Sequence, residues 1–389
     1  MHIKKIHRFA IAVTTVVTLL FVVAASQPHM SHAAGTTFIV DSRQDEPDDN
    51  PGDGVCATYQ NKCTFRAALD ESNALPGPNQ IHFNILNSGS CPSSATTIYG
   101  YSSNFYNGGD YVGSYVITDD GLTIDGYTQC QASPNTNEID GNADIRIQIT
   151  NGSGGGAYGL VINSDNNLIR GLSIYGWERN VEIRDAAYNR FSGNFVGMKA
   201  NGSDGNGKTG VRINFGASYN IIGGTDFADR NIISGNGFEG LDIQGDDVVH
   251  NHIINNYIGV KQDGRTALQN SADAVDLAER AAYNWVGGIM LDGLGQPILD
   301  EKGRTIADPR KRNIIAGNSQ DGIEISHKLE TQYNHFVGNW IGLDAYGDPL
   351  GNGDNGVTFE DQVNNNYVYQ NIIVDSDANG VRFYTVYDN

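Results

Sequence analysis

The amino-acid sequence predicts an all-β protein whose body is a right-handed parallel β-helix, a solenoid in which each coil adds one rung to several parallel sheets. Two observations favour this fold: a short strand pattern recurs from residue 159 onward, and an asparagine recurs at a similar distance after each copy. A third observation concerns the cap. All four cysteines lie in the first third of the chain, which predicts a disulfide-bonded N-terminal cap containing a short helix.

The repeated strand begins with a small residue and then alternates apolar and variable residues. Its copies are Gly-Leu-Val-Ile-Asn (159–163), Asn-Val-Glu-Ile-Arg (180–184), Gly-Val-Arg-Ile-Asn (210–214), Gly-Leu-Asp-Ile-Gln (240–244), Ala-Val-Asp-Leu-Ala (274–278), Gly-Ile-Glu-Ile-Ser (322–326), Gly-Val-Thr-Phe-Glu (356–360) and Gly-Val-Arg-Phe-Tyr (380–384). Intervals of roughly 20 to 35 residues, with one of 48, are typical of a solenoid.

The recurring asparagines predict the corners of the coils. The first series is Asn167, Asn189, Asn220, Asn251, Asn284, Asn334, Asn366 and Asn389, and the second is Asn194, Asn236, Asn256, Asn318, Asn339 and Asn371. Asparagine tolerates left-handed backbone geometry, and its amide can bond the same group one coil away, so we expect internal ladders. The segments between the strands are too short for helices, and the leucine-rich-repeat signature is absent.

The N-terminal region predicts export. Three basic residues precede the apolar segment 9–25, and Ser31 and Ala33 supply the small residues of a cleavage site. A membrane anchor is the alternative. We therefore expect a signal peptide over residues 1–33, a cap with the first coils over 34–150, β-helix repeats over 151–389, and a secreted, extracellular protein.

The cysteines and the helix together define the cap. In an exported protein an even number of cysteines indicates disulfides. We expect Cys56–Cys63 and Cys91–Cys130, although the sequence permits three pairings. A zinc site is not expected, because no histidine lies beside the cysteines at ligand spacing. Thr64 is a suitable N-cap for a helix that ends at Asn73.

The charge excludes one class of partner. The formal net charge of −20 leaves no basic footprint for nucleic acid, and no membrane contact is expected once the signal peptide is removed. The chain stops at Asn389, a corner asparagine, without an evident cap over the last coil. Because an open sheet edge invites pairing, we expect a further C-terminal domain or a cell-surface contact to cover it.

A family resemblance rests on the N-terminal region and two later segments. The chain resembles a bacterial extracellular family named for its Cys-Ser-Leu-Arg-Glu-Ala motif, although Thr64, Phe65 and Ala67 replace Ser, Leu and Glu. The resemblance implies a secreted β-helix of the pectate-lyase-like class with an N-terminal cap, in a family whose members mostly lack an established activity. The matching segments are 40–42, 50–56, 63–68, 123–129, 222–224 and 230–236.

The outward positions of the repeated strands supply the candidate active site. In register, one outward column is Val161, Glu182, Arg212, Asp242, Asp276, Glu324, Thr358 and Arg382, and its neighbour is Asn163, Arg184, Asn214, Gln244, Ala278, Ser326, Glu360 and Tyr384. Asp242, Asp276 and Glu324 form three successive carboxylates about 4.8 Å apart, which we assign as the catalytic set. The surrounding substrate-binding candidates are Arg212, Arg280, His327, Lys328, Gln244 and Glu360.

Three interpretations of this acidic row remain open. Crowded carboxylates raise the pKa of at least one member, as glycoside hydrolysis of a polysaccharide requires, with either the retaining or the inverting separation. A lyase would instead use Ca²⁺ against a uronate and Lys328, Arg280 or His327 as the base. The third is a non-catalytic structural or adhesive β-helix with a charge ladder. We expect no required cofactor and assign no metal ligands. The 289–312 insertion follows the coil that carries Asp276 and could wall a groove over it, but the sequence does not give its side of the β-helix.

Overall fold

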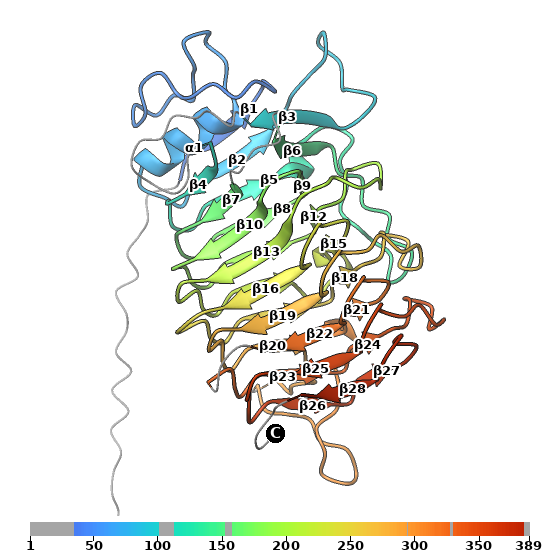
Figure 1. Cartoon of the computed structure of the whole chain (residues 1–389). Helices are drawn as coiled ribbons and strands as arrows, with labels where there is room; N and C mark the ends of the chain where they lie inside the picture. The colour runs from blue at the N-terminus through green and yellow to red at the C-terminus, as the bar shows by residue number, and fades with distance from the viewer. Residues whose placement is uncertain (1–34, 101–112, 152–157, 294, 327–329, 385–389) are drawn as a thin grey trace, which may run out of the picture. The chain divides into compact units, whose positions relative to one another are not determined.

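A computed structural model describes residues 35–100, 113–151, 158–293, 295–326 and 330–384. Within these residues, strands of successive coils stack into three parallel sheets (Figure 1). Each coil passes through the sheets in one repeating order, as β7, β8 and β9 illustrate, before β10 returns to the sheet of β7. The protein is therefore a parallel β-helix, as predicted.

The strands form sheets 1, 2 and 3, which contain ten, nine and nine strands in the described residues. Sheet 1 contains β1 (Thr37–Val40), β2 (Gln80–Phe83), β5 (Thr123–Asp125), β8 (Leu168–Arg170), β11 (Arg190–Ser192), β14 (Ile221–Gly223), β17 (His252–Ile254), β20 (Trp285–Gly287), β23 (His335–Val337) and β26 (Tyr367–Tyr369). Sheet 2 contains β4 (Tyr115–Ile117), β7 (Tyr158–Ile162), β10 (Arg179–Arg184), β13 (Thr209–Asn214), β16 (Leu241–Gln244), β19 (Val275–Ala278), β22 (Ile323–Ile325), β25 (Val357–Phe359) and β28 (Val381–Phe383). Sheet 3 contains β3 (Thr96–Gly100), β6 (Ile147–Asn151), β9 (Leu172–Tyr175), β12 (Phe195–Val196), β15 (Ile232–Ile233), β18 (Tyr257–Ile258), β21 (Ile314–Ile315), β24 (Trp340–Ile341) and β27 (Ile372–Ile373).

The core fills the interior of the coils with aliphatic side chains in aligned columns. In sheet 2, Val181, Val211 and Leu241 are Cα partners on successive rungs, and all three are fully buried. Each such side chain contributes about 1.5–3 kcal/mol by leaving water. On sheet 3, Ile232 and Tyr257 are Cα partners on adjacent rungs and belong to a second buried cluster. This cluster packs between the outer face of the sheet and the loops.

Asparagine ladders line the corners, as predicted, but there are three of them in the described residues. The first contains Asn167, Asn189, Asn220, Asn251, Asn284, Asn334 and Asn366. The second contains Asn194, Asn231, Asn256, Asn313, Asn339 and Asn371. The third contains Asn180, Asn236, Asn270, Asn318 and Asn352.

The predicted second series was therefore wrong in its membership. It mixed two corners: Asn236 and Asn318 belong to the third ladder, and Asn194 and Asn256 to the second. Spacing along the chain did not separate them because the connections between sheets vary in length. Asn389 lies outside the described residues.

The left-handed residue at the first corner precedes the ladder asparagine and is often aromatic. Tyr219, His250 and Tyr283 have φ values of 57°, 58° and 58°. Their rings form a stacked series that also includes Tyr188 and Tyr333, with centroids 4.8–5.5 Å apart. Positive φ is unfavourable for bulky residues, and ring stacking between coils offsets part of that cost.

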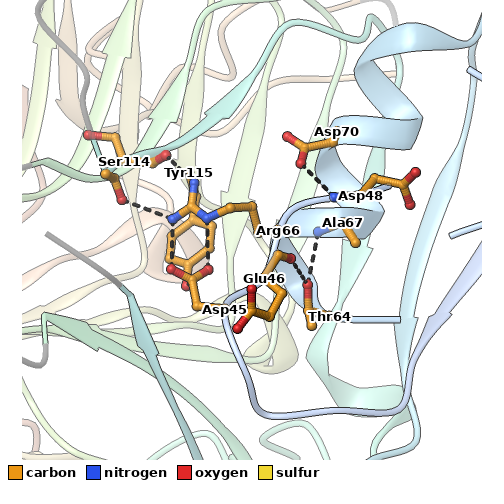
Figure 2. Close-up of polar contacts among 10 residues, drawn as sticks. Asp45, Glu46, Asp48, Thr64, Arg66, Ala67, Asp70, Ser114 and Tyr115 are labelled. Carbon is orange, nitrogen blue, oxygen red and sulfur yellow. Dashed lines mark hydrogen bonds and ion pairs between the residues drawn. The ribbon is translucent and has the colours of Figure 1, made fainter. Parts of the chain in front are cut away.

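The N-terminal cap contains α1 (Phe65–Ala74), one residue displaced from the predicted helix. Thr64 is its N-cap, as predicted, and its hydroxyl accepts from the Ala67 N–H at 3.0 Å. Arg66 on α1 donates to both oxygens of Asp45, and the Tyr115 hydroxyl donates to the same carboxylate at 2.8 Å (Figure 2). This buried network attaches the cap to the first strand of sheet 2.

Both predicted disulfides, Cys56–Cys63 and Cys91–Cys130, are present. Three short 3₁₀ helices complete the secondary structure of the described residues, at Gly126–Thr128, Phe227–Asp229 and Pro309–Lys311. Among the described residues, no helix combines the length and the apolar character needed to cross a bilayer. The predicted signal peptide, residues 1–33, lies outside the described residues, and secretion stays a prediction.

Candidate active site on the outer face of sheet 2

The acidic row lies on the outward face of sheet 2 in the predicted register. Asp242 on β16 is the Cα partner of Asp276 on β19, and Asp276 is the partner of Glu324 on β22. These three strands lie side by side in Figure 1. Adjacent rungs hold the three carboxyl groups about 4.8 Å apart at the backbone. The flanking aliphatic residues point into the core and fix this outward orientation.

The rungs that precede Asp276 compensate their charges. Arg212 Nη1 lies 3.0 Å from Asp242 Oδ2. The side-chain amide of Gln244 can satisfy both neighbours in one orientation. Its oxygen then accepts a hydrogen bond from Arg212, and its nitrogen donates one to Asp242 Oδ1 at 3.3 Å. One rung earlier, Glu182 is paired with Arg179 at 2.8 Å. Burial raises the pKa of Asp242 to about 6, although the Arg212 charge opposes this shift.

Asp276 has no comparable compensation. Among the described residues it forms no ion pair, and its hydrogen bond from Ser326 Oγ is long, at 3.5 Å. Burial raises the pKa of Asp276 well above its usual value, and the charges of Asp242 and Glu324 raise it further. Burial thus raises the pKa of both carboxyl groups, but among the described residues only Asp242 has a neighbouring cation, Arg212, that opposes the shift.

Two further acids that the sequence interpretation missed belong to the same cluster. Asp273 and Asp321 are buried. One carboxylate oxygen from each of Asp273, Asp321 and Glu324 lies within 4.8 Å of the other two. Burial, followed by the Glu324 charge, raises the pKa of Asp273 to about 8. This trio could hold a cation, since carboxylate oxygens suit Ca²⁺.

The same two aspartates also have a structural role. Asp273 Oδ1 accepts the Asp321 N–H at 2.8 Å, and Asp321 Oδ1 accepts the Asn355 N–H at 2.6 Å. They thus form a ladder like the asparagine ladders. Each aspartate directly precedes the small residue that opens a strand repeat. An acid at this same place in two successive repeats was the available sequence signal.

The predicted substrate-binding residues are distributed unevenly. Arg212 and Gln244 contact Asp242, whereas Arg280 is exposed and forms ion pairs with Asp246 and Glu330. Glu360 lies one rung beyond Ser326. Partial burial raises its pKa most, and the charge of Glu324 raises it further. His327 and Lys328 lie outside the described residues.

The structure places the 289–312 insertion away from the acidic row, which settles a position that the sequence left open. It connects β20 of sheet 1 to β21 of sheet 3. In other coils this connection is as short as the two residues between β17 and β18. The insertion therefore leaves the β-helix at the corner between sheets 1 and 3, and not beside sheet 2.

The fold is similar to the crystal structure of an alginate lyase from Paenibacillus sp. str. FPU-7, with a TM-score of 0.42 and 14% sequence identity over 90% of this chain and 99% of that one. No protein-family model and no curated protein matches the sequence. The fold is thus established by its own strand order, and the sequence resemblance to the extracellular family stays a prediction.

Proposed function

We propose that this protein is a secreted, carbohydrate-active enzyme that cleaves a polysaccharide by glycoside hydrolysis on the outer face of sheet 2. The observation that carries the proposal is the contrast between Asp276 and Asp242. They lie on adjacent rungs, yet one lacks a cationic partner among the described residues and the other is paired with Arg212. Two carboxyl groups with pKa values held apart are the requirement of glycoside hydrolysis.

In this proposal Asp276 is the general acid and donates its proton to the glycosidic oxygen. Asp242, ionised and positioned by Arg212 and Gln244, attacks the anomeric carbon to form a glycosyl-enzyme, which water then hydrolyses with Asp276 as the general base. Glu324 keeps the pKa of Asp276 high from the opposite rung. A rung spacing of about 4.8 Å is close to the separation of roughly 5–5.5 Å found in retaining enzymes. We therefore expect net retention of anomeric configuration.

The test is a turnover assay on a panel of plant, algal and bacterial polysaccharides, following reducing ends and the absorbance of unsaturated uronates. New reducing ends without unsaturation support hydrolysis, and unsaturated products would instead establish a lyase. Asp276→Asn should lower turnover by at least about 100-fold. The matched control is Asp348→Asn, because Asp348 is exposed and forms no ion pair among the described residues. Equal activity of the two variants, or no cleavage of any polymer, would favour the non-catalytic scaffold.

A further inference from the structure

A pocket lies on a different part of the molecule from the acidic row, at the corner between sheets 1 and 3. It forms where the connections of several coils meet: segment 225–230 after β14, Asn255 after β17, and 309–312 at the end of the long insertion. Trp340 on β24 and Tyr257 on β18 contribute its aromatic walls. Its volume is about 300 Å³, at the lower end of the range for small-molecule sites.

Two arginines in this pocket are held on the faces of its aromatic rings. Arg230 Cζ lies 4.2 Å from the centroid of Tyr257, and Arg312 Cζ lies 4.3 Å from that of Trp340. Arg230 also donates to Asn255 Oδ1 through Nη2 at 3.1 Å and through Nε at 3.3 Å. The guanidinium groups are thereby positioned before any ligand arrives, which lowers the entropic cost of binding.

In the part of the chain that the structure describes, neither arginine is paired with a carboxylate. Among the described residues Arg230 and Arg312 form no ion pair, although the chain has 45 acidic and 25 basic residues. The Arg312 Nε atom is buried without a hydrogen-bond partner. Burial lowers the pKa of both side chains. By contrast, the neighbouring Arg310 is paired with Asp308 at 3.1 Å.

Arg230 is buried and Arg312 is half-buried, and a desolvated cation without an ion-pair partner is costly unless an anion neutralises it. Glu138 lines the pocket, and its charge partly opposes the lowering of both arginine pKa values, but it is exposed and forms no ion pair with either arginine among the described residues. In a chain of net charge −20, this arrangement does not result from a general excess of positive charge. It indicates a site that is completed by an anionic ligand.

We propose that this pocket binds the carboxylate of an acidic saccharide, with one uronate ring against the aromatic and apolar walls. A planar guanidinium is geometrically matched to a carboxylate, and apolar walls such as Ile139 and Phe227 suit a sugar ring better than a bare inorganic anion. The site is separate from the acidic row on sheet 2, so it does not depend on the proposed hydrolytic chemistry.

The experiment is isothermal titration calorimetry of the mature protein. The dissociation constants of a tri-uronate, a neutral trisaccharide and inorganic phosphate are each measured at low and at physiological salt. We expect the tri-uronate to bind, the neutral trisaccharide to bind at least about 10-fold more weakly, and phosphate to be a poor competitor. Absence of tri-uronate binding would overturn the proposal. Equal binding of the neutral sugar, or phosphate binding as tight as that of the tri-uronate, would also overturn it.

Variants localise the binding to this pocket. Arg312→Gln should weaken tri-uronate binding by about 10-fold or more, whereas Glu138→Gln should strengthen it by removing a competing charge. The matched control is Arg304→Gln, in the same insertion but outside the pocket and paired with Asp300. A thermal melt confirms that each variant is folded. If Arg304→Gln and Arg312→Gln weaken binding equally, the effect reflects general charge and the assigned pocket is wrong.

Discussion

Arg212 Nη1 lies 3.0 Å from Asp242 Oδ2, one rung before Asp276 in the outward column of sheet 2. This ion pair divides the row electrostatically, because it stabilises the ionised form of Asp242 without providing a partner for Asp276. The two carboxyl groups share a strand position and a chemical type, and only their neighbours distinguish them.

Arg212→Gln should move the acid limb of the pH–activity profile upward. Arg212 lowers the pKa of Asp242 against the effect of burial, so its removal raises that pKa above its value of about 6. Asp242 would then be ionised only at higher pH. The measurement is kcat/KM from pH 4 to 9, and an unchanged acid limb would contradict a role for ionised Asp242.

Asp276→Asn should stabilise the fold at high pH and have little effect at low pH. The raised pKa means that folded Asp276 binds its proton more tightly than the unfolded chain does. Its contribution to stability is therefore present below the unfolded pKa of about 3.9 and is lost as pH rises toward the folded pKa. We expect a gain of about 1 kcal/mol or more in the free energy of unfolding at pH 8.

Urea denaturation at pH 4.5 and pH 8 measures this difference, with Asp348→Asn as the matched variant. A gain of equal size at both pH values would mean that the amide improves packing and that proton binding is not the cause. A loss of stability at pH 8 would contradict the absence of a compensating cation at Asp276.

Chelation of divalent cations should leave turnover within about twofold of the untreated enzyme, because general acid–base hydrolysis by two carboxyl groups requires no cation. The assay compares activity after EDTA treatment with activity after Ca²⁺ is restored. Loss and recovery would instead point to a Ca²⁺-dependent lyase and to the carboxylates of Asp273, Asp321 and Glu324 as its cation ligands.

Asn251→Ala should destabilise the β-helix by about 2–4 kcal/mol, since each buried group left without a partner costs about 1–3 kcal/mol. The fully buried Asn251 accepts from the Asn220 N–H and Nδ2, and its own Nδ2 donates to Ala217 O and Asn284 Oδ1. Chemical denaturation measures the loss. Asn201→Ala, in an exposed loop, is the control and should change stability by less than about 1 kcal/mol.

The sequence by itself determined the elements that repeat. Alternating apolar residues fix which side chains of a strand face the core, and copies of one strand pattern fix the register between coils. The partnership of Asp242, Asp276 and Glu324 followed from that register, and the Thr64 cap and the Cys56–Cys63 disulfide followed from local spacing. The Cys91–Cys130 pairing, with a sequence separation of 39, was preferred from the sequence but not determined by it.

Only the tertiary structure decided what the irregular connections do. It separated the ladders of Asn236 and Asn256, brought Asp273 to Glu324, and placed the 289–312 insertion at the corner of sheets 1 and 3. It also joined Arg230 and Arg312, which are far apart in sequence, in one pocket. Connections of unequal length share no period, so their positions are set by the sheets that they link and by contacts between distant coils.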